Sequence, residues 1–329
     1  MSRVFSGVRP SGRLHLGNYL GAVKSWLELQ NTNECIFAVV DYHGITTPFE
    51  PKSLQKQIRE VVMDYLAAGL DPDKAKIIVQ SQVPEHTELA WILGTITPIS
   101  WLERIPTFKE KRTDHPEYIN LGLLAYPVLM AADILIYHAQ KVPVGEDQLP
   151  HIEMTNQIAK RFKTMFGYEF PKVEAVLSKG PRIMSLSNPL KKMSKTGDES
   201  IALSDSPEQI RERIGKAVTD TGPVAGKDFM SPGVKNLFIL MEIFSTFQTF
   251  KKFREQHKKG IIKYEQMKKQ LAEDIIKSLE SVRKRRLELE KDPKYIDKVL
   301  FEGAEFARPL AQETLREVKK AMGLEYANS

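Results

Sequence analysis

Short, continuous apolar runs alternate with segments of helical spacing through the first half of this chain. The clearest run covers residues 36–40, where Ile, Phe, Ala and two Val residues follow one another without a polar residue. Strands of a parallel sheet are covered on both faces and have this composition, whereas a strand with one face in water alternates apolar and polar residues. Parallel strands also need long crossover connections, which the intervening helical segments supply. The first half therefore predicts an α/β domain with a doubly wound parallel sheet.

The same two patterns place the remaining elements of the first half. Further strands are expected at residues 4–7, 77–79 and 142–144. One helix is expected to begin at about residue 15, and two more to cover about residues 52–68 and 148–166.

After residue 180 the composition changes. Residues 181–205 are rich in Ser, Pro, Lys and Gly, which is typical of a mobile loop. Beyond residue 206 the spacing is almost entirely helical, and it predicts one long helix over 264–290 and a last helix over 305–322. We therefore expect an α/β domain in residues 1–190, a mobile loop in 191–205 and an all-helical domain in 206–329.

Cysteine content and hydropathy limit the class of protein. Cys35 is the only cysteine, so neither an intramolecular disulfide nor a cysteine-based zinc cluster can form. The sequence has no apolar run long enough to cross a bilayer, and its first residues lack the apolar core of a secretory signal. We therefore expect a cytoplasmic protein with no membrane partner.

Charge is unevenly distributed along the chain. The 48 Lys and Arg residues exceed the 42 Asp and Glu residues, which gives a formal net charge of +6. Basic residues gather between residues 251 and 298, and they include the cluster Arg283-Lys284-Arg285-Arg286. Such a cluster can be a solvated helix face or a surface for RNA phosphates. The charge pattern alone leaves both interpretations open.

The stretch RPSGRLHLGN at residues 9–18 lies between the first expected strand and the first expected helix. Ligands of open α/β sheets bind beyond the carboxyl ends of the strands, and a helix N-terminus offers unpaired N–H groups to phosphate. Gly17 lets a ligand approach the backbone, and His15 can donate a hydrogen bond to a phosphate oxygen. A structural turn without a ligand would explain the same residues.

The stretch KKMSKT at residues 191–196 lies in the expected mobile loop. Lys191, Lys192 and Lys195 repel one another unless an anion lies between them. An exposed lysine-rich loop without a ligand is the simpler interpretation of these residues alone.

The stretch YPVLMAADILI at residues 126–136 contains a single carboxylate, Asp133, among uncharged residues. Burying an unpaired carboxylate costs several kcal/mol or raises its pKa. Asp133 therefore needs a hydrogen-bond donor or a place at a helix end. A helix cap or an internal hydrogen bond would satisfy it, and so would a donor on a ligand.

The stretch VPVGEDQ at residues 142–148 leads from a strand into a helix. Gly145 permits close approach of a ligand to the backbone. Asp147 and Gln148 fall at the expected helix start. Capping of that helix by Asp147 is the structural alternative, and it is compatible with ligand contact.

Together, and in their order along the chain, these segments resemble the motifs of class I aminoacyl-tRNA synthetases, most closely those of the bacterial-type tryptophan branch. Asn18 stands where the general pattern has a second His, as is usual in that branch, and Thr196 replaces a final Ser but keeps the hydroxyl. The resemblance extends over nearly the whole chain. It implies a Rossmann-like catalytic domain, a KMSKS-type loop and a helical domain that binds the tRNA anticodon, whose last helix could pack back on the catalytic domain.

The resemblance also implies a reaction. The enzyme would activate L-tryptophan with ATP to give tryptophanyl-adenylate and pyrophosphate, and would then transfer tryptophan to tRNA(Trp). Mg²⁺ would be carried by the ATP phosphates, since the sequence has no carboxylate cluster suited to holding it. A homodimer with tRNA spanning both subunits is implied as well.

Residue roles follow from the same resemblance. The implied catalytic residues are His15, Lys192 and Lys195, and the lysines would hold the β- and γ-phosphates as pyrophosphate departs. The implied ATP site comprises Arg9, Pro10, Ser11, Gly17, Asn18, Gly145, Glu146, Asp147, Ile183, Lys192, Met193, Ser194, Lys195 and Thr196. The implied tryptophan site comprises Phe5, His43, Tyr126, Met130, Asp133, Val142, Val144 and Gln148.

Asp133 would accept the indole N–H, which is the one donor on a large apolar side chain. Tyr126 and Gln148 would contact the amino group of tryptophan. His43 follows the second expected strand and is a candidate for the carboxylate side, with a hydrogen-bonded structural histidine as the alternative. Three other functions remain as alternatives: a tyrosine-specific synthetase, a nucleotidylyltransferase of the same superfamily, and a non-catalytic RNA-binding relative.

Overall fold

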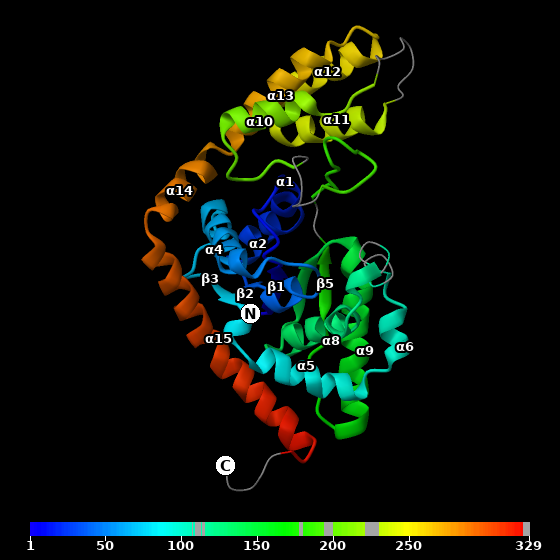
Figure 1. The fold of residues 1–329 in the computed structure, drawn as a ribbon, viewed down its shortest axis with the longest axis vertical. Helices are drawn as coiled ribbons and strands as arrows, with labels where there is room; N and C mark the ends of the chain where they lie inside the picture. The colour runs from blue at the N-terminus through cyan, green and yellow to red at the C-terminus, as the bar shows by residue number, and fades with distance from the viewer. Residues whose placement is uncertain are drawn as a thin grey trace.

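The computed structural model describes residues 1–106, 108, 113, 116–177, 180–193, 200–220 and 230–324. A five-stranded parallel sheet lies at its centre, in the order β3-β2-β1-β4-β5 (Figure 1). The strands are β1 (Arg3–Val8), β2 (Glu34–Val39), β3 (Ala75–Val79), β4 (Lys141–Val144) and β5 (Glu174–Leu177). The order reverses between β1 and β4, which is where open α/β sheets bind ligands. The predicted doubly wound parallel sheet is confirmed.

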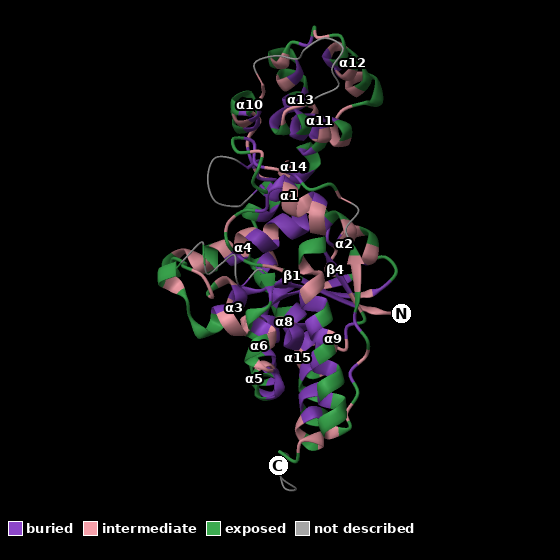
Figure 2. Ribbon diagram, turned by 90° about the vertical axis from the view of Figure 1, so that its right-hand side faces the viewer, coloured by how far each residue is buried: buried purple, intermediate pink, exposed green. Residues whose placement is uncertain are grey.

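The central strands are apolar on both faces because each face has its own core. Along β2, Cys35, Phe37 and Val39 belong to one buried cluster, whereas Ile36 and Ala38 belong to the other. Successive side chains of a strand point to opposite faces, so this position requires a run without polar residues. Figure 2 shows the sheet and the inner sides of the surrounding helices as buried.

Helices cover both faces of the sheet. One face packs against α1 (Leu16–Asn18), a π-helical turn (Tyr19–Val23), α2 (Lys24–Leu29) and α4 (Pro51–Ala68). The other face packs against α5 (Glu85–Ile96), α8 (Leu121–Leu135) and α9 (Leu149–Phe166). Shorter helices lie in the connections: α3 (Asp41–Gly44), α6 (Ile99–Glu103) and 3₁₀ turns at Gln80–Gln82, Pro116–Tyr118 and Glu146–Gln148.

The described part of the second half is helical, apart from its connections. Its elements are α10 (Pro207–Lys216), α11 (Pro232–Phe244), α12 (Phe247–Lys258), α13 (Tyr264–Ser278), α14 (Glu280–Glu290) and α15 (Pro293–Ala321). In Figure 1, α10 to α13 form a group above the sheet, while α14 and α15 run back down beside α4 and β3.

Helix α15 packs directly on the edge strand β3. A Cβ at Gly303 would lie 1.9 Å from the carbonyl oxygen of Ile77, so only glycine allows this approach. Residues Ala307 and Leu315 of the same helix belong to the core on one face of the sheet, and Val299 belongs to the core on the other. The helix therefore covers a sheet edge that would otherwise be open to pairing.

The prediction of one long helix over residues 264–290 is wrong. Helices α13 and α14 meet at the buried Leu279, whose φ of −90° and ψ of 2° end the first helix. The Arg283 guanidinium donates to the carbonyl of Ile276 at 2.7 Å and so satisfies a carbonyl near the break. The bend has a packing cause, because α13 packs against α10 and α11 whereas α14 packs against α4.

One helix boundary and one strand also differ from expectation. Helix α15 begins at Pro293, not near residue 305, with the Asp292 side chain accepting the Tyr295 N–H at 3.1 Å. Aspartate followed by proline is a helix-start signal that marks this boundary. Strand β5 was not expected, because it is a short edge strand whose side chains are half-buried or exposed and lack a clear pattern. Among the described residues, no helix combines the length and apolar character needed to span a bilayer.

Candidate active site

His15 lies in the turn that follows β1, at the N-terminus of α1. Its Nδ1 accepts the backbone N–H of Asn18 at 3.3 Å, and the Asn18 side chain accepts the N–H of His15 at 3.4 Å. Because Nδ1 acts as an acceptor, a neutral ring carries its proton on Nε2. Gly12, with φ of 114°, takes the left-handed conformation that this turn requires. The imidazole is thus fixed with its other nitrogen as a donor.

Gly17 is required by the same arrangement. A Cβ at this position would lie 2.9 Å from Nδ1 and Cε1 of the His15 ring. It would also lie 3.8 Å from Cβ of Met193, which places the start of the lysine-rich segment beside this turn. Any side chain at residue 17 would therefore displace the imidazole from its position at the helix start.

The chain that follows the lysine-rich segment pairs with the His15 turn. Ala202 and His15 form an antiparallel bridge, flanked by hydrogen bonds from Leu16 N–H to Ile201 O and from Leu203 N–H to Leu14 O, both 2.9 Å. Residues 200–205 are almost all buried. This end of the expected mobile loop is therefore fixed to the turn by backbone hydrogen bonds.

The other end of that loop forms a small antiparallel pair. Met184 and Lys192 form a bridge, and the N–H of Met193 donates to Ile183 O at 3.0 Å. The Asn236 side chain in α11 accepts the N–H of Met184 at 3.0 Å and donates to its carbonyl at 2.9 Å. The loop base is thus attached to the helical part as well. Residues Ser194, Lys195 and Thr196 lie outside the described residues.

Lys192 brings two predicted segments together. Its Nζ lies 3.8 Å from Oδ1 of Asp147. Burial would raise the pKa of Asp147, but a 2.8 Å hydrogen bond from Gln148 and the charge of Lys192 outweigh it and lower that pKa. A Cβ at Gly145 would lie 2.7 Å from the same Oδ1, so glycine makes room for this carboxylate. Glu146, next to it, is exposed.

The structural alternative for Asp147 is not observed. Helix α9 begins at Leu149 with Gln148 as its N-cap, and no side chain caps it. The carboxylate of Asp147 is directed to Gln148 and Lys192.

The remaining residues of the predicted ATP site occupy different environments. Arg9 and Ser11 are exposed at the turn, whereas Pro10 is buried and would lie 3.2 Å from a Cβ at Gly44. Ile183 is 2 % exposed and lies in the same core cluster as Met193. The side chain of Ile183 is therefore covered by protein, so a ligand would meet its backbone first.

Asp133 in α8 is buried and, among the described residues, accepts hydrogen bonds from three side chains. Its Oδ1 lies 2.7 Å from Nε2 of Gln80 and 2.7 Å from Nδ1 of His86, and its Oδ2 lies 2.8 Å from Nε2 of His43. Burial would raise the pKa of Asp133, but the hydrogen bonds and charges of His43 and His86 lower it to about 2. The internal hydrogen bonding left open as an alternative is thus observed. A carboxylate has about four acceptor sites, so one remains for a further donor.

Gln80 and His86 were missed in the sequence. Gln80 directly follows β3 and His86 lies near the start of α5, so both come from the carboxyl end of a strand. Polar residues just after a buried strand were the available signal. His86 also bonds the hydroxyl of Tyr137 at 2.7 Å, and the Tyr137 ring stacks on Phe5 with centroids 5.6 Å apart.

Tyr126 lies beside this group. Its ring centroid is 6.2 Å from that of His43, and its hydroxyl lies 2.7 Å from Nε2 of His151. Burial lowers the pKa of His151 to about 4, so the ring is neutral at pH 7. His151, from α9, was also missed, because nothing in the sequence relates it to Tyr126 in α8.

Apolar residues of the predicted tryptophan site share one core. Phe5, Val142 and Val144 are buried in the same cluster, and the half-buried Met130 packs against it. Gln148 is also half-buried. The four apolar side chains come from β1, β4 and α8, around the reversal of strand order.

A cavity of about 290 Å³ lies elsewhere, between α4, the end of β3 and α15. Its lining includes Arg59, Asp297, Phe301 and Arg308, and none of the predicted site residues that the structure describes. The ion pair of Arg59 with Asp297 crosses it from α4 to α15. This cavity is separate from the candidate active site.

Comparison with known proteins gives one family. The model described as tRNA synthetases class I (W and Y) matches residues 1–280. The tryptophan–tRNA ligase of Rickettsia conorii is 46% identical over 326 residues, covering 97% of this chain and 98% of that protein. The counterpart from Caldanaerobacter subterraneus is 44% identical over 329 residues, covering 98% and 99%.

Solved structures agree. Tryptophanyl-tRNA synthetase from Campylobacter jejuni, complexed with ADP and tryptophan, has a TM-score of 0.83 and 31% identity, covering 98% of this chain and 100% of that one. The enzyme from Mycoplasma pneumoniae has a TM-score of 0.85 and 31% identity, covering 99% and 98%. The chain belongs to the family of class I tRNA synthetases specific for tryptophan and tyrosine.

Proposed function

We propose that this chain is a tryptophan–tRNA ligase, which forms tryptophanyl-adenylate from L-tryptophan and ATP and then charges tRNA(Trp). The observation that carries the proposal is the convergence of three segments at the β1–β4 reversal. Met193 lies beside Gly17, and Lys192 lies 3.8 Å from Asp147. Relatives with 46% and 44% identity that carry this name support the same conclusion.

ATP binds along this convergence. Its phosphates lie at the N-terminus of α1, where Nε2 of His15 donates to an oxygen and Gly17 and Asn18 leave the backbone accessible. The ribose and adenine lie toward Gly145, Glu146 and Asp147. Mg²⁺ enters on the phosphates as part of the substrate.

The chemical step is attack of the tryptophan carboxylate on the α-phosphorus of ATP. The carboxylate is already ionised at neutral pH, so the step needs no general base and no covalent enzyme intermediate. Lys192 and Lys195 stabilise the charge that develops on the departing pyrophosphate. Catalysis therefore rests on positioning and on charge stabilisation.

Tryptophan binds against Phe5, Met130, Val142 and Val144, with its indole N–H as the fourth donor to Asp133. The Oδ2 atom of Asp133 is the better acceptor, since one side-chain donor contacts it whereas two contact Oδ1. The side chain of phenylalanine has no N–H and would leave that acceptor site unfilled.

Tyr126, Gln148 and His43 hold the amino and carboxylate groups of the amino acid. Neutral His151 accepts a hydrogen bond from the Tyr126 hydroxyl, which leaves the lone pairs of the hydroxyl oxygen for an ammonium group.

The helical part binds tRNA(Trp) with exposed lysines. On α12 these are Lys251, Lys252 and Lys258, with Lys259 directly after it. Arg286 takes no part, since only 3 % of its side chain is exposed. The RNA-facing interpretation of the cluster at residues 283–286 is therefore restricted to its exposed members, Lys284 and Arg285. We expect the enzyme in the cytoplasm, where tRNA is charged.

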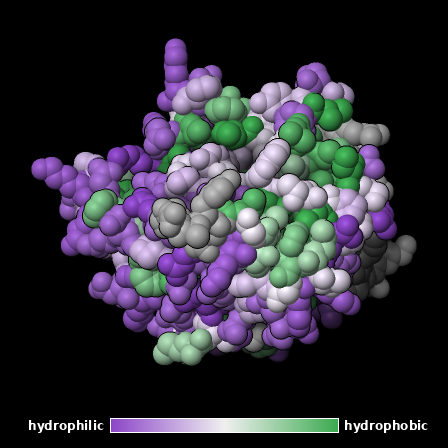
Figure 3. Space-filling model, turned by 90° about the horizontal axis from the view of Figure 1, so that it is seen from below, coloured by the Kyte–Doolittle hydropathy of each residue, from purple (hydrophilic) through white to green (hydrophobic). Residues whose placement is uncertain are grey.

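A homodimer forms through α5, α6 and α8. Trp91, Ile99 and Leu121 are 76%, 64% and 75% exposed on these helices. Figure 3 views the molecule from the end where α5 and α6 lie, and shows hydrophobic side chains gathered on one half of that face. Exposed apolar patches of this kind favour a protein partner.

Amino-acid-dependent exchange of pyrophosphate into ATP tests the function. Exchange with tryptophan, and none with tyrosine, is the expected result. Exchange with tyrosine would favour the tyrosine-specific alternative, and no exchange with either would favour a nucleotidylyltransferase or a non-catalytic relative.

A further inference from the structure

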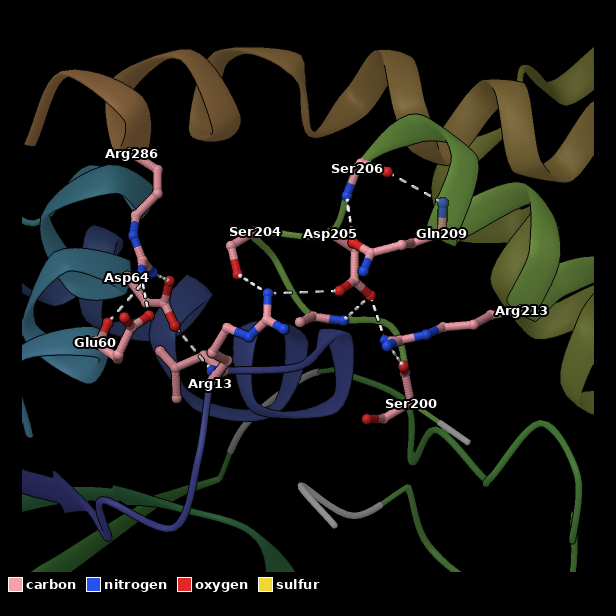
Figure 4. A network of polar contacts seen from close by, with 12 residues as sticks. Arg13, Glu60, Asp64, Ser200, Ser204, Asp205, Ser206, Gln209, Arg213 and Arg286 are labelled. Carbon is pink, nitrogen blue, oxygen red and sulfur yellow. Dashed lines mark hydrogen bonds and ion pairs between the residues drawn. The ribbon is translucent and has the colours of Figure 1, made fainter. Parts of the chain in front are cut away.

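A buried ion network joins the helical part to the α/β domain. Arg286 of α14 forms ion pairs with Asp64 and Glu60 of α4 (Figure 4). Its Nε lies 3.3 Å from Oε1 of Glu290. The side chains of Arg286 and Asp64 are 3 % and 1 % exposed. A fully buried guanidinium–carboxylate pair thus lies at the junction of the two parts.

The second oxygen of Asp64 reaches the active-site turn. Its Oδ2 accepts the backbone N–H of Leu14 at 2.8 Å. Leu14 directly precedes His15, and its carbonyl accepts the N–H of Leu203 at 2.9 Å. Both backbone groups of Leu14 are therefore held, one by α4 and one by the chain that follows the lysine-rich segment.

Asp64 depends on Arg286 for its negative charge. Burial raises the pKa of Asp64 to about 6, although the charge of Arg286 and the Leu14 N–H both lower it. The charge of Glu60 raises it further. Removing Arg286 would leave a carboxylate without compensation in the interior, where it would take up a proton.

A second arginine of the helical part contacts residues 200–205, the segment that pairs with the turn. Arg213 of α10 pairs with Asp205 and with the carbonyl of Ser200, and Asp205 accepts the N–H of Ala202 at 2.8 Å. Ala202 is the residue that bridges to His15. Figure 4 shows Arg286 directed at Asp64 and Glu60, and Arg213, from a different helix, directed at Asp205 and Ser200.

Stability alone is a weak reason for a buried ion pair. An apolar pair of similar size often stabilises a fold as well or better. An apolar pair could not, however, accept the N–H of Leu14. The geometry therefore separates two effects of the network, namely packing of α14 on α4 and fixing of the backbone before His15.

We propose that Asp64 is a positioning residue for the His15 turn, and that its ion pair with Arg286 keeps it directed at Leu14, so that the helical part acts on ATP binding through this pair. The proposal rests on the proposed function, in which the His15 turn receives the ATP phosphates. Neither residue touches substrate. Their effect reaches the phosphates through the backbone of Leu14 and the ring of His15.

The double variant Asp64→Leu/Arg286→Met separates packing from positioning. It replaces the ion pair by apolar groups, so the thermal unfolding midpoint should stay close to that of the unmodified chain. In pyrophosphate exchange, kcat/KM for ATP should fall roughly tenfold or more, as expected when a hydrogen bond to a charged acceptor is lost, with KM for tryptophan unchanged. If the double variant kept both the stability and the kcat/KM for ATP of the unmodified chain, the proposal would be overturned.

Single variants provide a second test that does not depend on the double variant. Arg286→Lys keeps the positive charge and should retain KM for ATP, whereas Arg286→Met should raise it. Arg59→Met is the matched control, because it removes another ion pair of α4 with the helical part, to Asp297, and touches nothing in the turn. An unchanged KM for ATP in folded Arg286→Met would also overturn the proposal.

Hydrogen exchange distinguishes this proposal from the function on which it rests. The amide of Leu14 should be protected in the unmodified chain and should exchange faster in the double variant. If the unmodified chain shows no exchange of pyrophosphate, the proposed function fails, while faster amide exchange would still support the role of Asp64. Unchanged protection of Leu14 would contradict that role whatever the activity.

Discussion

Nε2 of His43 lies 2.8 Å from Oδ2 of Asp133, at the end of a buried group that also includes Gln80 and His86. His43 follows β2, Gln80 and His86 follow β3, and Asp133 lies in α8. Side chains that follow two different strands thus hold this carboxylate; burial would raise its pKa, but His43 and His86 lower it to about 2. An ionised acceptor held in this way is pre-organised for a single further donor.

Replacing Gly17 tests the fixed position of the His15 ring. In Gly17→Ala the new Cβ would lie 2.9 Å from the imidazole, so the ring must leave its place at the helix start. We expect KM for ATP in pyrophosphate exchange to rise roughly tenfold or more, with the dissociation constant of tryptophan unchanged. Gly21→Ala is the control, because nothing lies within 4 Å of a Cβ there. Equal KM values for the two variants would contradict this role of Gly17.

The two proposed catalytic lysines can be tested by truncation. Lys192→Ala and Lys195→Ala should each lower the rate of adenylation by about a hundredfold, the size of effect seen when one donor to developing charge is removed. Tryptophan binding should change little, because neither lysine belongs to the proposed amino-acid pocket. Lys191→Ala, with an exposed side chain, is the control. Adenylation at the normal rate in Lys195→Ala would be incompatible with the pyrophosphate role.

The neutral state of His151 predicts a pH dependence of stability. Its pKa is lowered from 6.5 to about 4, so the unfolded chain binds a proton at a higher pH than the folded chain does. The stabilisation is present above pH 6.5 and is lost as the pH falls through about 4. Between pH 7 and 5 the free energy of unfolding should fall by about 2 kcal/mol from this group alone.

Comparison with His151→Gln isolates that contribution. Urea unfolding at pH 7 and pH 5 should show a smaller loss of stability in this variant, while other titrating groups act equally in both proteins. The side-chain carbonyl of Gln can still accept a hydrogen bond from the Tyr126 hydroxyl. If both proteins lose the same free energy of unfolding between these pH values, His151 is not a buried neutral histidine.

The basic surface of α12 predicts salt-dependent tRNA binding. Lys258→Ala/Lys259→Ala should weaken tRNA binding and lower the slope of log K against log salt by about one for each phosphate that is no longer neutralised. Pyrophosphate exchange needs no tRNA and should be unaffected. Lys160→Ala, an exposed change on α9, is the control. An unchanged salt slope in the double variant would exclude these lysines from the RNA surface.

Hydrophobic periodicity and turn residues in the sequence predicted individual strands, helices and turns of the fold. The apolar run at residues 36–40 requires cover on both faces, and β2 has it. The segment at residues 9–18 predicted a strand-to-helix turn, and His15 lies at that helix start. Each of these follows from periodicity and turn chemistry, which a single sequence contains.

Long-range contacts were not predictable in the same way. The partners of Asp133 come from residues 43, 80 and 86, and nothing in the sequence relates them to residue 133. Arg286 lies in a basic cluster that favours the surface, yet it is buried because Asp64 and Glu60 lie opposite it. The bend at Leu279 has the same origin, since α14 must turn to reach α4. Such features depend on tertiary packing and not on local propensity.

A crystal structure with tryptophan bound tests the amino-acid assignment most directly, through one distance. The proposed function predicts the indole nitrogen within about 3.2 Å of a carboxylate oxygen of Asp133, with Phe5, Val142 and Val144 against the ring. An indole nitrogen bound elsewhere, with Asp133 bonded only to Gln80, His86 and His43, would contradict it.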